Sequence, residues 1–231
     1  MTDAAKPAPR DPFDLPDVSD LSIGVLGGTG EQGRGLALRW AMAGHRVVLG
    51  SRDAHRAAAS ASELGHGVTG AANDACAAGA DVVVAAVPWA GHAALLESLA
   101  EPLSGKILID CVNPLGFDKQ GAFALPVEQG SAAQQAAELL PESRVVAAFH
   151  HISAVLLLDP AVESLDTDVL VLGDDRGATD IVQALANQIP GIRGLYGGRL
   201  RNAGQIESFT ANLISMNRRY KSHAGVRITD V

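Results

Sequence analysis

Short, uninterrupted apolar runs recur along the chain and alternate with segments whose apolar residues follow a helical period. Runs of this kind, without the alternation of a half-exposed strand, are typical of strands that are covered on both faces. They predict strands at residues 21–27, 46–50, 81–87, 106–112, 144–149 and 168–174, and a weaker strand near residues 67–69. The pattern thus predicts a sheet buried between helices.

Helical segments lie between most of these runs. They are predicted at residues 31–44, 53–64, 92–103, 131–140 and 179–189, with a short helix that ends near Ala75. Asp53 and the Asp174-Asp175 pair precede two of these helices and are expected to supply N-caps. Residues 113–130 contain Gly, Pro and Asn, which predicts a loop. Strands alternating with helices favour an α/β fold with a Rossmann-type, doubly wound parallel sheet.

The C-terminal part of the chain has a different organisation. A last helix is predicted from near Arg199, with Ile206, Phe209, Leu213 and Met216 forming one apolar face. We place a boundary near residue 146. The predicted organisation is a mobile N-terminal tail (residues 1–20), a nucleotide-binding domain (residues 21–145) and a smaller C-terminal α/β and helical domain (residues 146–231).

The composition narrows the class of protein. The 231 residues, 47% of them hydrophobic, suffice for one large domain or for one domain with a small appendage. A net charge of -8 argues against a nucleic-acid partner, which usually requires a basic surface. Cys76 and Cys111 stand in no metal or redox spacing. With no apolar stretch for a signal peptide or a membrane span, we expect a cytoplasmic protein without a membrane partner.

Residues 28–33, GTGEQG, match the G-x-G-x-x-G fingerprint of dinucleotide binding. The motif gains weight from its context, because it follows a predicted strand and opens a predicted helix. We expect Gly28 to permit a tight turn, Gly30 to let the backbone approach a pyrophosphate, and Gly33 to let the helix pack close to the strand. The alternative is a strand-to-helix turn with a purely structural role.

The next predicted strand ends in Ser51-Arg52, where the fingerprint usually has an acidic residue that binds the ribose 2′-hydroxyl. A hydroxyl and a guanidinium would instead bind a 2′-phosphate. Arg56 lies four residues beyond Arg52 and is expected on the same helical face. We therefore predict NADP in preference to NAD. The alternative is that Ser51 and Arg52 merely begin a solvated helix.

His150-His151 and two tryptophans are further candidates. Adjacent residues of a strand point to opposite sides, so the two histidines are not expected to share a metal, and we predict no metal site. His150 could contact a cofactor or could be an ordinary buried histidine. Trp89 could stand beside a cofactor or in the core at a strand end, and Trp40 is expected to pack inside the protein.

Several segments together resemble one family. They are LGGTGEQGRGLALR, GHRVVLGSR, VPW at residues 87–89, FHHISA at residues 149–154 and GGRLRNAGQIES at residues 197–208. They look like the F-420-dependent NADP reductases of archaea and actinobacteria, which are 8-hydroxy-5-deazaflavin:NADP oxidoreductases. The resemblance covers nearly the whole chain after the tail. The combination is more specific than the glycine loop alone.

The resemblance implies reversible hydride transfer between the nicotinamide of NADPH and the deazaflavin coenzyme F-420 (F420). Such a reaction requires no protein nucleophile, and the chain would position two rings and exclude water. The implied NADP contacts are Thr29, Gly30, Glu31, Gln32, Gly33, Ser51, Arg52, Arg56, Trp89, Asn113 and the Ala154 backbone. The implied deazaflavin contacts are Pro114, His150, Ile152 and Ala224. The family resemblance also implies a homodimer.

The chain departs from the family in some positions. His151 and Ser153 stand where the archaeal proteins more often have Thr and Pro, and Asn113 replaces an apolar residue. A basic group near the end, Arg218, Arg219, Lys221 and Arg227, would suit the anionic phosphate and glutamate tail of the deazaflavin. It would equally complement the dipole of a helix end.

Two other functions stay open at the level of sequence. An NADP-dependent imine or hydroxy-acid reductase shares this kind of N-terminal half but usually has a longer helical substrate domain. An NADPH-sensing protein would bind the cofactor without turnover. No catalytic carboxylate pair or nucleophile motif favours a further class of enzyme.

Overall fold

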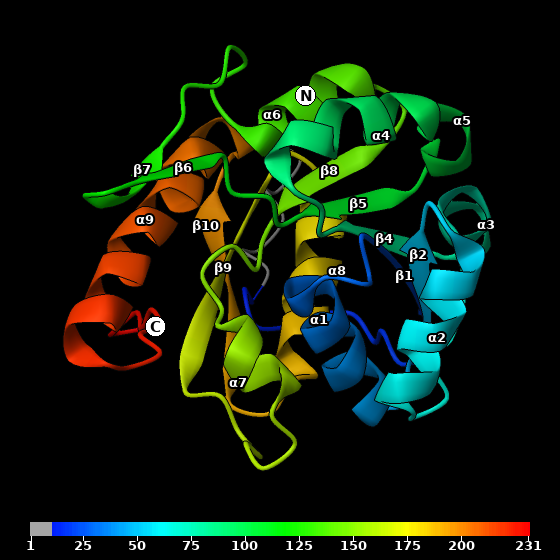
Figure 1. The fold of residues 1–231 in the computed structure, drawn as a ribbon, viewed down its shortest axis with the longest axis horizontal. Coiled ribbons are helices and arrows are strands. Elements are labelled where there is room, and N and C mark those ends of the chain that lie inside the picture. Colours follow the sequence, from blue (N-terminus) through cyan, green and yellow to red (C-terminus); the bar gives the residue numbers. More distant parts are fainter. Residues whose placement is uncertain (1–10) are drawn as a thin grey trace, which may run out of the picture.

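An eight-stranded sheet organises the protein, with the strand order β10-β9-β8-β5-β4-β1-β2-β3 (Figure 1). The computed structural model describes residues 11–231, so residues 1–10 of the predicted tail lie outside the described residues. The strands are β1 (Ser22–Leu26), β2 (Arg46–Ser51), β3 (Thr69–Ala72), β4 (Val82–Ala85), β5 (Ile107–Asp110), β8 (Arg144–Ala147), β9 (Thr167–Gly173) and β10 (Ile192–Gly198). All neighbours are parallel except β8 and β9. The predicted α/β fold with a mostly parallel sheet is confirmed.

The helices largely follow the predicted segments. They are α1 (Glu31–Met42), α2 (Ala54–Leu64), α3 (Asn73–Gly79), α4 (His92–Ser98), α5 (Ala100–Leu103), α6 (Ala132–Leu139), α7 (Ala154–Leu158), α8 (Arg176–Asn187) and α9 (Ala203–Tyr220), with 3₁₀ turns η1 (Trp89–Gly91) and η2 (Leu200–Asn202). The side chains of Asp53 and Asp175 accept hydrogen bonds from the first-turn N–H groups of α2 and α8. Both predicted N-caps are confirmed.

The predicted loop at residues 113–130 is wrong in its middle. Residues there form an antiparallel hairpin of β6 (Leu115–Asp118) and β7 (Gly121–Ala124), which lies beside α9 (Figure 1). The Asp118 carboxylate accepts hydrogen bonds from the N–H groups of Gln120 and Gly121, and Gly121 has a φ of 129°. These hydrogen bonds and the glycine conformation stabilise the turn of the hairpin. Its two strands show too little alternation of apolar and polar residues to be predicted from the sequence. Strand β10 was also not predicted, because glycines interrupt its apolar run.

The predicted apolar face of α9 is only partly correct. Leu213 is buried, but Phe209 and Met216 are 37% and 42% exposed. The buried side of α9 also carries Ala203, Glu207 and Ala211. The helix therefore packs through Leu213, two small residues and a buried carboxylate, and part of its predicted apolar face is exposed to solvent.

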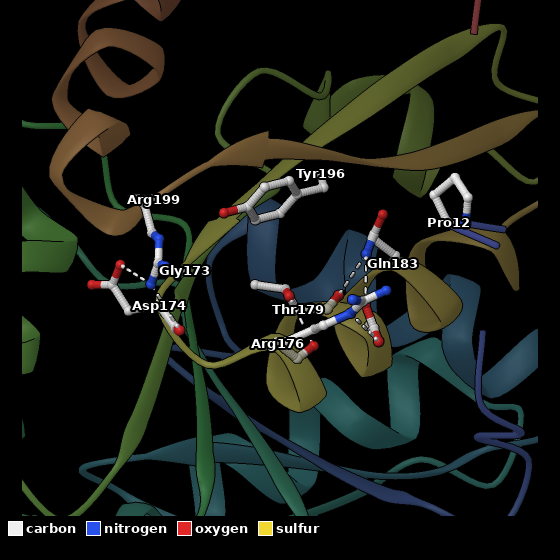
Figure 2. A pocket seen from close by; sticks show the side chains of 9 residues that line it. Pro12, Gly173, Asp174, Arg176, Thr179, Gln183, Tyr196 and Arg199 are labelled. Atoms are coloured by element: carbon white, nitrogen blue, oxygen red, sulfur yellow. Dashed lines mark hydrogen bonds and ion pairs between the residues drawn. The ribbon is translucent and has the colours of Figure 1, made fainter. Parts of the chain in front are cut away.

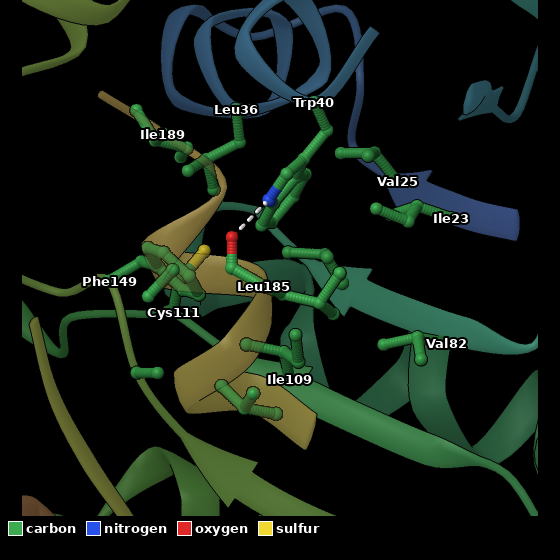
Figure 3. Close-up of a cluster of buried hydrophobic side chains, with 14 of the residues drawn as sticks. Ile23, Val25, Leu36, Trp40, Val82, Ile109, Cys111, Phe149, Leu185 and Ile189 are labelled. Atoms are coloured by element: carbon green, nitrogen blue, oxygen red, sulfur yellow. Dashed lines mark hydrogen bonds between the residues drawn. The ribbon is translucent and has the colours of Figure 1, made fainter. Parts of the chain in front are cut away.

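Two apolar clusters form the core, one on each face of the sheet. Trp40 of α1 is fully buried in the first, where its indole Nε1 donates to the carbonyl of Leu185 at 2.9 Å (Figure 3). Its ring meets Phe149 edge to face, with centroids 5.4 Å apart. The predicted packing role of Trp40 is confirmed. This cluster draws on both sides of residue 146, and β8 spans that position, so the division into two domains stays a prediction.

Within residues 11–231, no helix is long and apolar enough to cross a membrane.

Candidate functional site

A cleft of about 660 Å³ opens at the carboxyl ends of β1, β2 and β4. Ligands of open α/β sheets bind in this place, because the loops that follow parallel strands meet there. Five of the predicted NADP contacts line it together: Thr29, Gly30, Ser51, Arg52 and Arg56. The structure thus brings the glycine loop and the predicted 2′-phosphate residues to one cavity.

The glycine loop is shaped by close approaches of the backbone. Gly27 has a φ of 72°, and a Cβ on it would lie 2.5 Å from the Ala86 carbonyl oxygen. The left-handed residue of the turn is therefore Gly27, and Gly28 also fits the tight turn that was predicted for it. Gly28 is needed for space, since a Cβ there would lie 2.8 Å from the Val25 carbonyl oxygen. A Cβ on Gly33 would lie 3.0 Å from the Gly27 carbonyl oxygen, which confirms its predicted packing role.

The start of α1 is suited to an anion. Gly30 is its N-cap and has no side chain that could accept from the first-turn N–H groups. Helix N-termini combine free N–H groups with the positive end of the helix dipole, so they bind phosphates well. Glu31 is exposed on this first turn.

The rim of the cleft at the end of β2 carries two exposed guanidinium groups, from Arg52 and Arg56. One carboxylate, that of Asp53, is also nearby. It accepts from the N–H groups of His55 at 2.9 Å and Arg56 at 3.3 Å, so its negative charge is directed at the start of α2. The rim is therefore arranged for an anion.

Asn73 is a residue of this cleft that the sequence did not reveal. It is the first residue of α3, lines the cleft, and has a buried side-chain oxygen without a hydrogen-bond partner among the described residues. A buried acceptor without a partner costs free energy unless a ligand or water satisfies it. The available signal was its position directly after β3, at the same edge of the sheet. The glycine cradle and this acceptor fit a dinucleotide.

The remaining predicted NADP residues are not among those that line the cleft. Trp89 is half-buried in η1, with its ring 5.5 Å from that of His92, while its neighbours Pro88 and Ala90 line the cleft. Ala154 is the first residue of α7, behind the N-cap Ser153.

The turn after β8 joins this cleft to the predicted deazaflavin side. Gln32 Nε2 donates to the Phe149 carbonyl at 3.1 Å, and Asn113 Nδ2 donates to the His150 carbonyl at 2.9 Å. Thr210 of α9 also donates to the His150 carbonyl, at 3.1 Å. Phe149 has a φ of 65°, an uncommon conformation for a bulky residue. Three elements therefore fix one strained turn, a feature typical of functional sites.

The predicted deazaflavin residues differ in their surroundings. Pro114 and His150 are both buried, and neither ring nitrogen of His150 has a hydrogen-bond partner among the described residues. Burial lowers the pKa of His150 to about 4, so the ring is neutral near pH 7 and can donate one hydrogen bond and accept another. Ile152 and Ala224 instead line a separate cavity of about 80 Å³. Ligand pockets usually measure ~300–1,000 Å³, so these two residues can border a ring system but not enclose it.

His150 and His151 lie in a turn, not on a strand as the metal argument assumed. His151 Nε2 donates to the Asp168 carbonyl at 2.7 Å. Within residues 11–231, no group of three His, Cys, Asp or Glu side chains is placed to bind a metal ion.

Known proteins share this architecture and these motifs. A family model described as "NADP oxidoreductase coenzyme F420-dependent" matches residues 22–114. The chain is 42% identical to the F420-dependent NADP reductase of Methanothermobacter thermautotrophicus over 91% of this chain and 96% of the relative. The chain belongs to this family. It is also 37% identical to the F420-dependent NADP reductase of Methanocaldococcus jannaschii, over 91% of this chain and 99% of the relative.

Solved structures extend the comparison. A structure from Arthrobacter sp. FB24, provisionally assigned as an F420-dependent NADP reductase, has a TM-score of 0.79 and 31% identity, covering 90% of this chain and 99% of that one. Pyrroline carboxylate reductase of Plasmodium falciparum has a TM-score of 0.60 at 14% identity, covering 89% of this chain and 66% of that one. The second likeness shows a shared fold alone.

In this member of the F420-dependent NADP reductase family, a cluster of buried polar side chains lies at the end of β5, just before Asn113 in the chain. His92 Nε2 lies 2.6 Å from Asp110 Oδ2, and both side chains are fully buried. Burial opposes the charged imidazole, but the hydrogen bond and charge of Asp110 outweigh it and raise the pKa of His92. Nearby, buried Glu207 accepts from the N–H groups of Ala132 and Ala133. Burial raises the pKa of Glu207 to about 7.

A further cavity of about 320 Å³ lies between α8 and β10 (Figure 2). It contains Tyr196, Arg176 and Arg199, and Arg199 is paired with Asp174. Because β9 is antiparallel to β8, its end at Gly173 lies at the sheet edge opposite the glycine loop. None of the predicted site residues of this reductase family member line this cavity.

Proposed function

We propose that this chain transfers a hydride reversibly between NADPH and coenzyme F420. The observation that carries the proposal is the similarity to F420-dependent NADP reductases along 91% of the chain, which includes both the cleft and the α9 side. The cleft supplies a specific reason for NADP. Arg52 and Arg56 stand on its rim, and the carboxylate of Asp53, which also lines the cleft, is engaged as a helix cap.

We propose the following roles for the NADP contacts. The first turn of α1, with Gly30, Glu31, Gln32 and Gly33, would bind the pyrophosphate through N–H groups, and Thr29 would add a hydroxyl. Ser51, Arg52 and Arg56 would bind the 2′-phosphate. We add Asn73 as a hydrogen-bond acceptor for the adenosine side, since its buried oxygen lacks a protein partner.

The chain would act on the reaction by positioning. F420, when bound, supplies a carbon that carries a hydride, so no protein group needs to form a bond to substrate. Gln32 and Asn113 both hold the Phe149-His150 turn, which lies between the proposed binding places of the two cofactors. Pro114, His150, Ile152 and Ala224 would contact the deazaflavin, and Trp89 and Ala154 the nicotinamide side of NADP. Correct placement of two reactants can contribute ~7–11 kcal/mol to lowering a barrier.

Mixing the purified protein with NADPH and oxidised F420 tests the proposal. Loss of the deazaflavin's visible absorbance with matched oxidation of NADPH is the expected result. Tight NADPH binding with no absorbance change would contradict it and favour an NADPH-sensing protein. Turnover only with an imine or keto acid would favour the other enzyme class. The structure of an Aspergillus terreus reductive aminase shares 19% identity and has a TM-score of 0.61, but this chain covers only 62% of it.

We further propose a cytoplasmic homodimer that works without metal or nucleic acid. Phe209, Met216 and Tyr220 are exposed along one side of α9, and apolar surface of this kind favours contact with a second chain. Light scattering would report a mass of two chains, and Phe209→Ser with Met216→Ser should shift it toward one. Turnover that survives a chelator would support the metal-free mechanism.

A further inference from the structure

The last ten residues, 222–231, form a strap without regular secondary structure that returns from the end of α9 to the start of β9. We call this segment the C-terminal strap. Lys221, in the left-handed conformation with a φ of 55°, turns the chain at the end of α9. Asn217 Oδ1 then accepts from the Ala224 N–H at 2.6 Å. These contacts fix where the strap begins.

One buried carboxylate fixes where the strap ends. Asp168 is fully buried at the start of β9, and its two oxygens accept from Arg193 at 2.8 and 2.7 Å. They also accept from the strap, namely from Arg227 Nη1 at 3.0 Å and from the Ile228 N–H at 2.6 Å. Arg193 itself donates to the strap carbonyls of Ile228 and Val231. Charge-assisted bonds of this kind are about twice as strong as neutral ones.

Asp168 also contacts the turn after β8, which carries His150, His151 and Ile152. The Asp168 N–H donates to the Val226 carbonyl of the strap at 2.7 Å, while its own carbonyl accepts from His151 Nε2 at 2.7 Å. His151 belongs to the turn that carries His150 and Ile152. Asp168 therefore connects the strap, through its side chain and N–H, with the His150-His151 turn, through its carbonyl.

These connections set the distance across the small cavity on the deazaflavin side. Ile152 of the turn and Ala224 of the strap line its two walls, and Ser153 Oγ lies 3.1 Å from His223 Nδ1 across it. A Cβ on Gly225 would lie 2.5 Å from Thr167 Oγ1, so the strap lies directly on β9. The residues described as lining the NADP cleft and those lining this small cavity are different sets.

We propose that Asp168 is a positioning residue for the deazaflavin. By anchoring the C-terminal strap, it keeps Ala224 opposite Ile152, so that one edge of the second cofactor meets two fixed walls. This inference rests on the proposed function. It differs from an electrostatic role for Arg227, because Arg227 is engaged with Asp168 and Asp166 and does not face an anionic ligand as a free charge.

Asp168→Asn distinguishes the two roles by the sign of its effect. It adds one unit of positive charge, so simple attraction of an anionic deazaflavin would lower the KM for F420. Loss of the anchor should instead raise the KM for F420 about tenfold, because one or two charge-assisted hydrogen bonds are lost. The KM for NADPH and kcat should stay within about twofold of the unchanged protein. Gly225→Ala, which lifts the strap from Thr167 without a change in charge, should act in the same direction.

Glu163→Gln is the matched control, because it also removes one negative charge. Glu163 is exposed just before β9 and is not among the residues that line the small cavity, so its loss should leave both KM values unchanged. Equal changes in the two KM values, or a lower melting temperature with neither KM changed, would overturn the proposal. If Asp168→Asn fails to fold, the comparison of Gly225→Ala with Glu163→Gln decides between the two roles. Absence of F420 turnover in the unchanged protein would instead reject the proposed function.

Discussion

The NADP half and the deazaflavin half of this protein hold their shape by different means. Around the cleft, the backbone makes the close approaches itself, as at Gly27 and Gly33, where a Cβ would clash. Around β9, α7 and α9, buried charged side chains bind distant backbone instead, as Arg39, Asp168 and Glu207 do. The close backbone packing around the cleft should be disrupted when a side chain is added to a glycine. The contacts around β9, α7 and α9 should be disrupted when a buried charged side chain is removed. Substitutions can test this difference directly.

The largest expected effect comes from Arg39, which joins the two halves. It is 2% exposed on α1 and donates to four backbone carbonyls of the α7 segment, those of Leu156, Leu157, Asp159 and Val162. Arg39→Met keeps much of the volume but leaves buried carbonyls without donors. The free energy of unfolding should fall by about 3–5 kcal/mol, measured by urea titration.

Arg34→Met on the same helix is the control for Arg39. Arg34 forms one ion pair with Glu63 at 3.2 Å, and Glu63 is 65% exposed. Exposed pairs contribute at most about 1 kcal/mol, so this variant should remain close to the unchanged protein. Equal losses for the two variants would mean that the buried anchor adds nothing beyond its position on α1.

A second test concerns the rim of the NADP cleft. Arg52→Ala should raise the KM for NADPH about 30-fold, because a charge-assisted contact to the 2′-phosphate is lost, and should change the KM for NADH by less than about twofold. Ser51→Glu should further reduce the preference for NADPH over NADH, measured as the ratio of the two KM values, because its carboxylate would repel the 2′-phosphate. His55→Ala, an exposed neighbour on α2, is the control. Equal losses for NADPH and NADH would mean that Arg52 only supports the start of the helix.

A third test uses pH on the buried carboxylate of α9. Burial raises the pKa of Glu207 to about 7, so the folded protein retains a proton that the unfolded chain releases above its usual pKa of 4.5. Folding stability contributed by this group is therefore present at low pH and falls as pH rises toward 7. The fall should be about 2 kcal/mol between pH 5 and pH 7. Glu207→Gln should flatten this dependence, whereas Glu101→Gln, at an exposed site, should leave the slope unchanged.

The same difference explains what could be predicted from sequence. The glycine loop, the Ser51-Arg52 pair and the central strands depend on neighbours a few residues away, so local patterns revealed them. The anchors depend on partners far along the chain: 118 residues separate Arg39 from Leu157, 75 separate Glu207 from Ala132, and 59 separate Arg227 from Asp168. No periodicity encodes such pairs. Strand β10 was not predicted because glycines interrupt its apolar run, and the hairpin was not predicted because its short strands show little apolar alternation.

The smallest expected effect concerns the exposed cations that were grouped from sequence. The structure separates them, since Arg227 is paired with Asp168 whereas Arg218 and Arg219 line a groove of about 560 Å³ between α9 and the hairpin. Replacing both Arg218 and Arg219 with Ala should raise the KM for F420 about threefold at low salt, with the difference lost at high salt, because exposed charges are screened. Arg176→Ala, at the opposite sheet edge, is the control. A lower melting temperature with an unchanged KM for F420 at both salt concentrations would mean that the two arginines only stabilise the C-terminal end of α9 through its dipole. The affinity for F420 would then come from the walls that Asp168 holds in place.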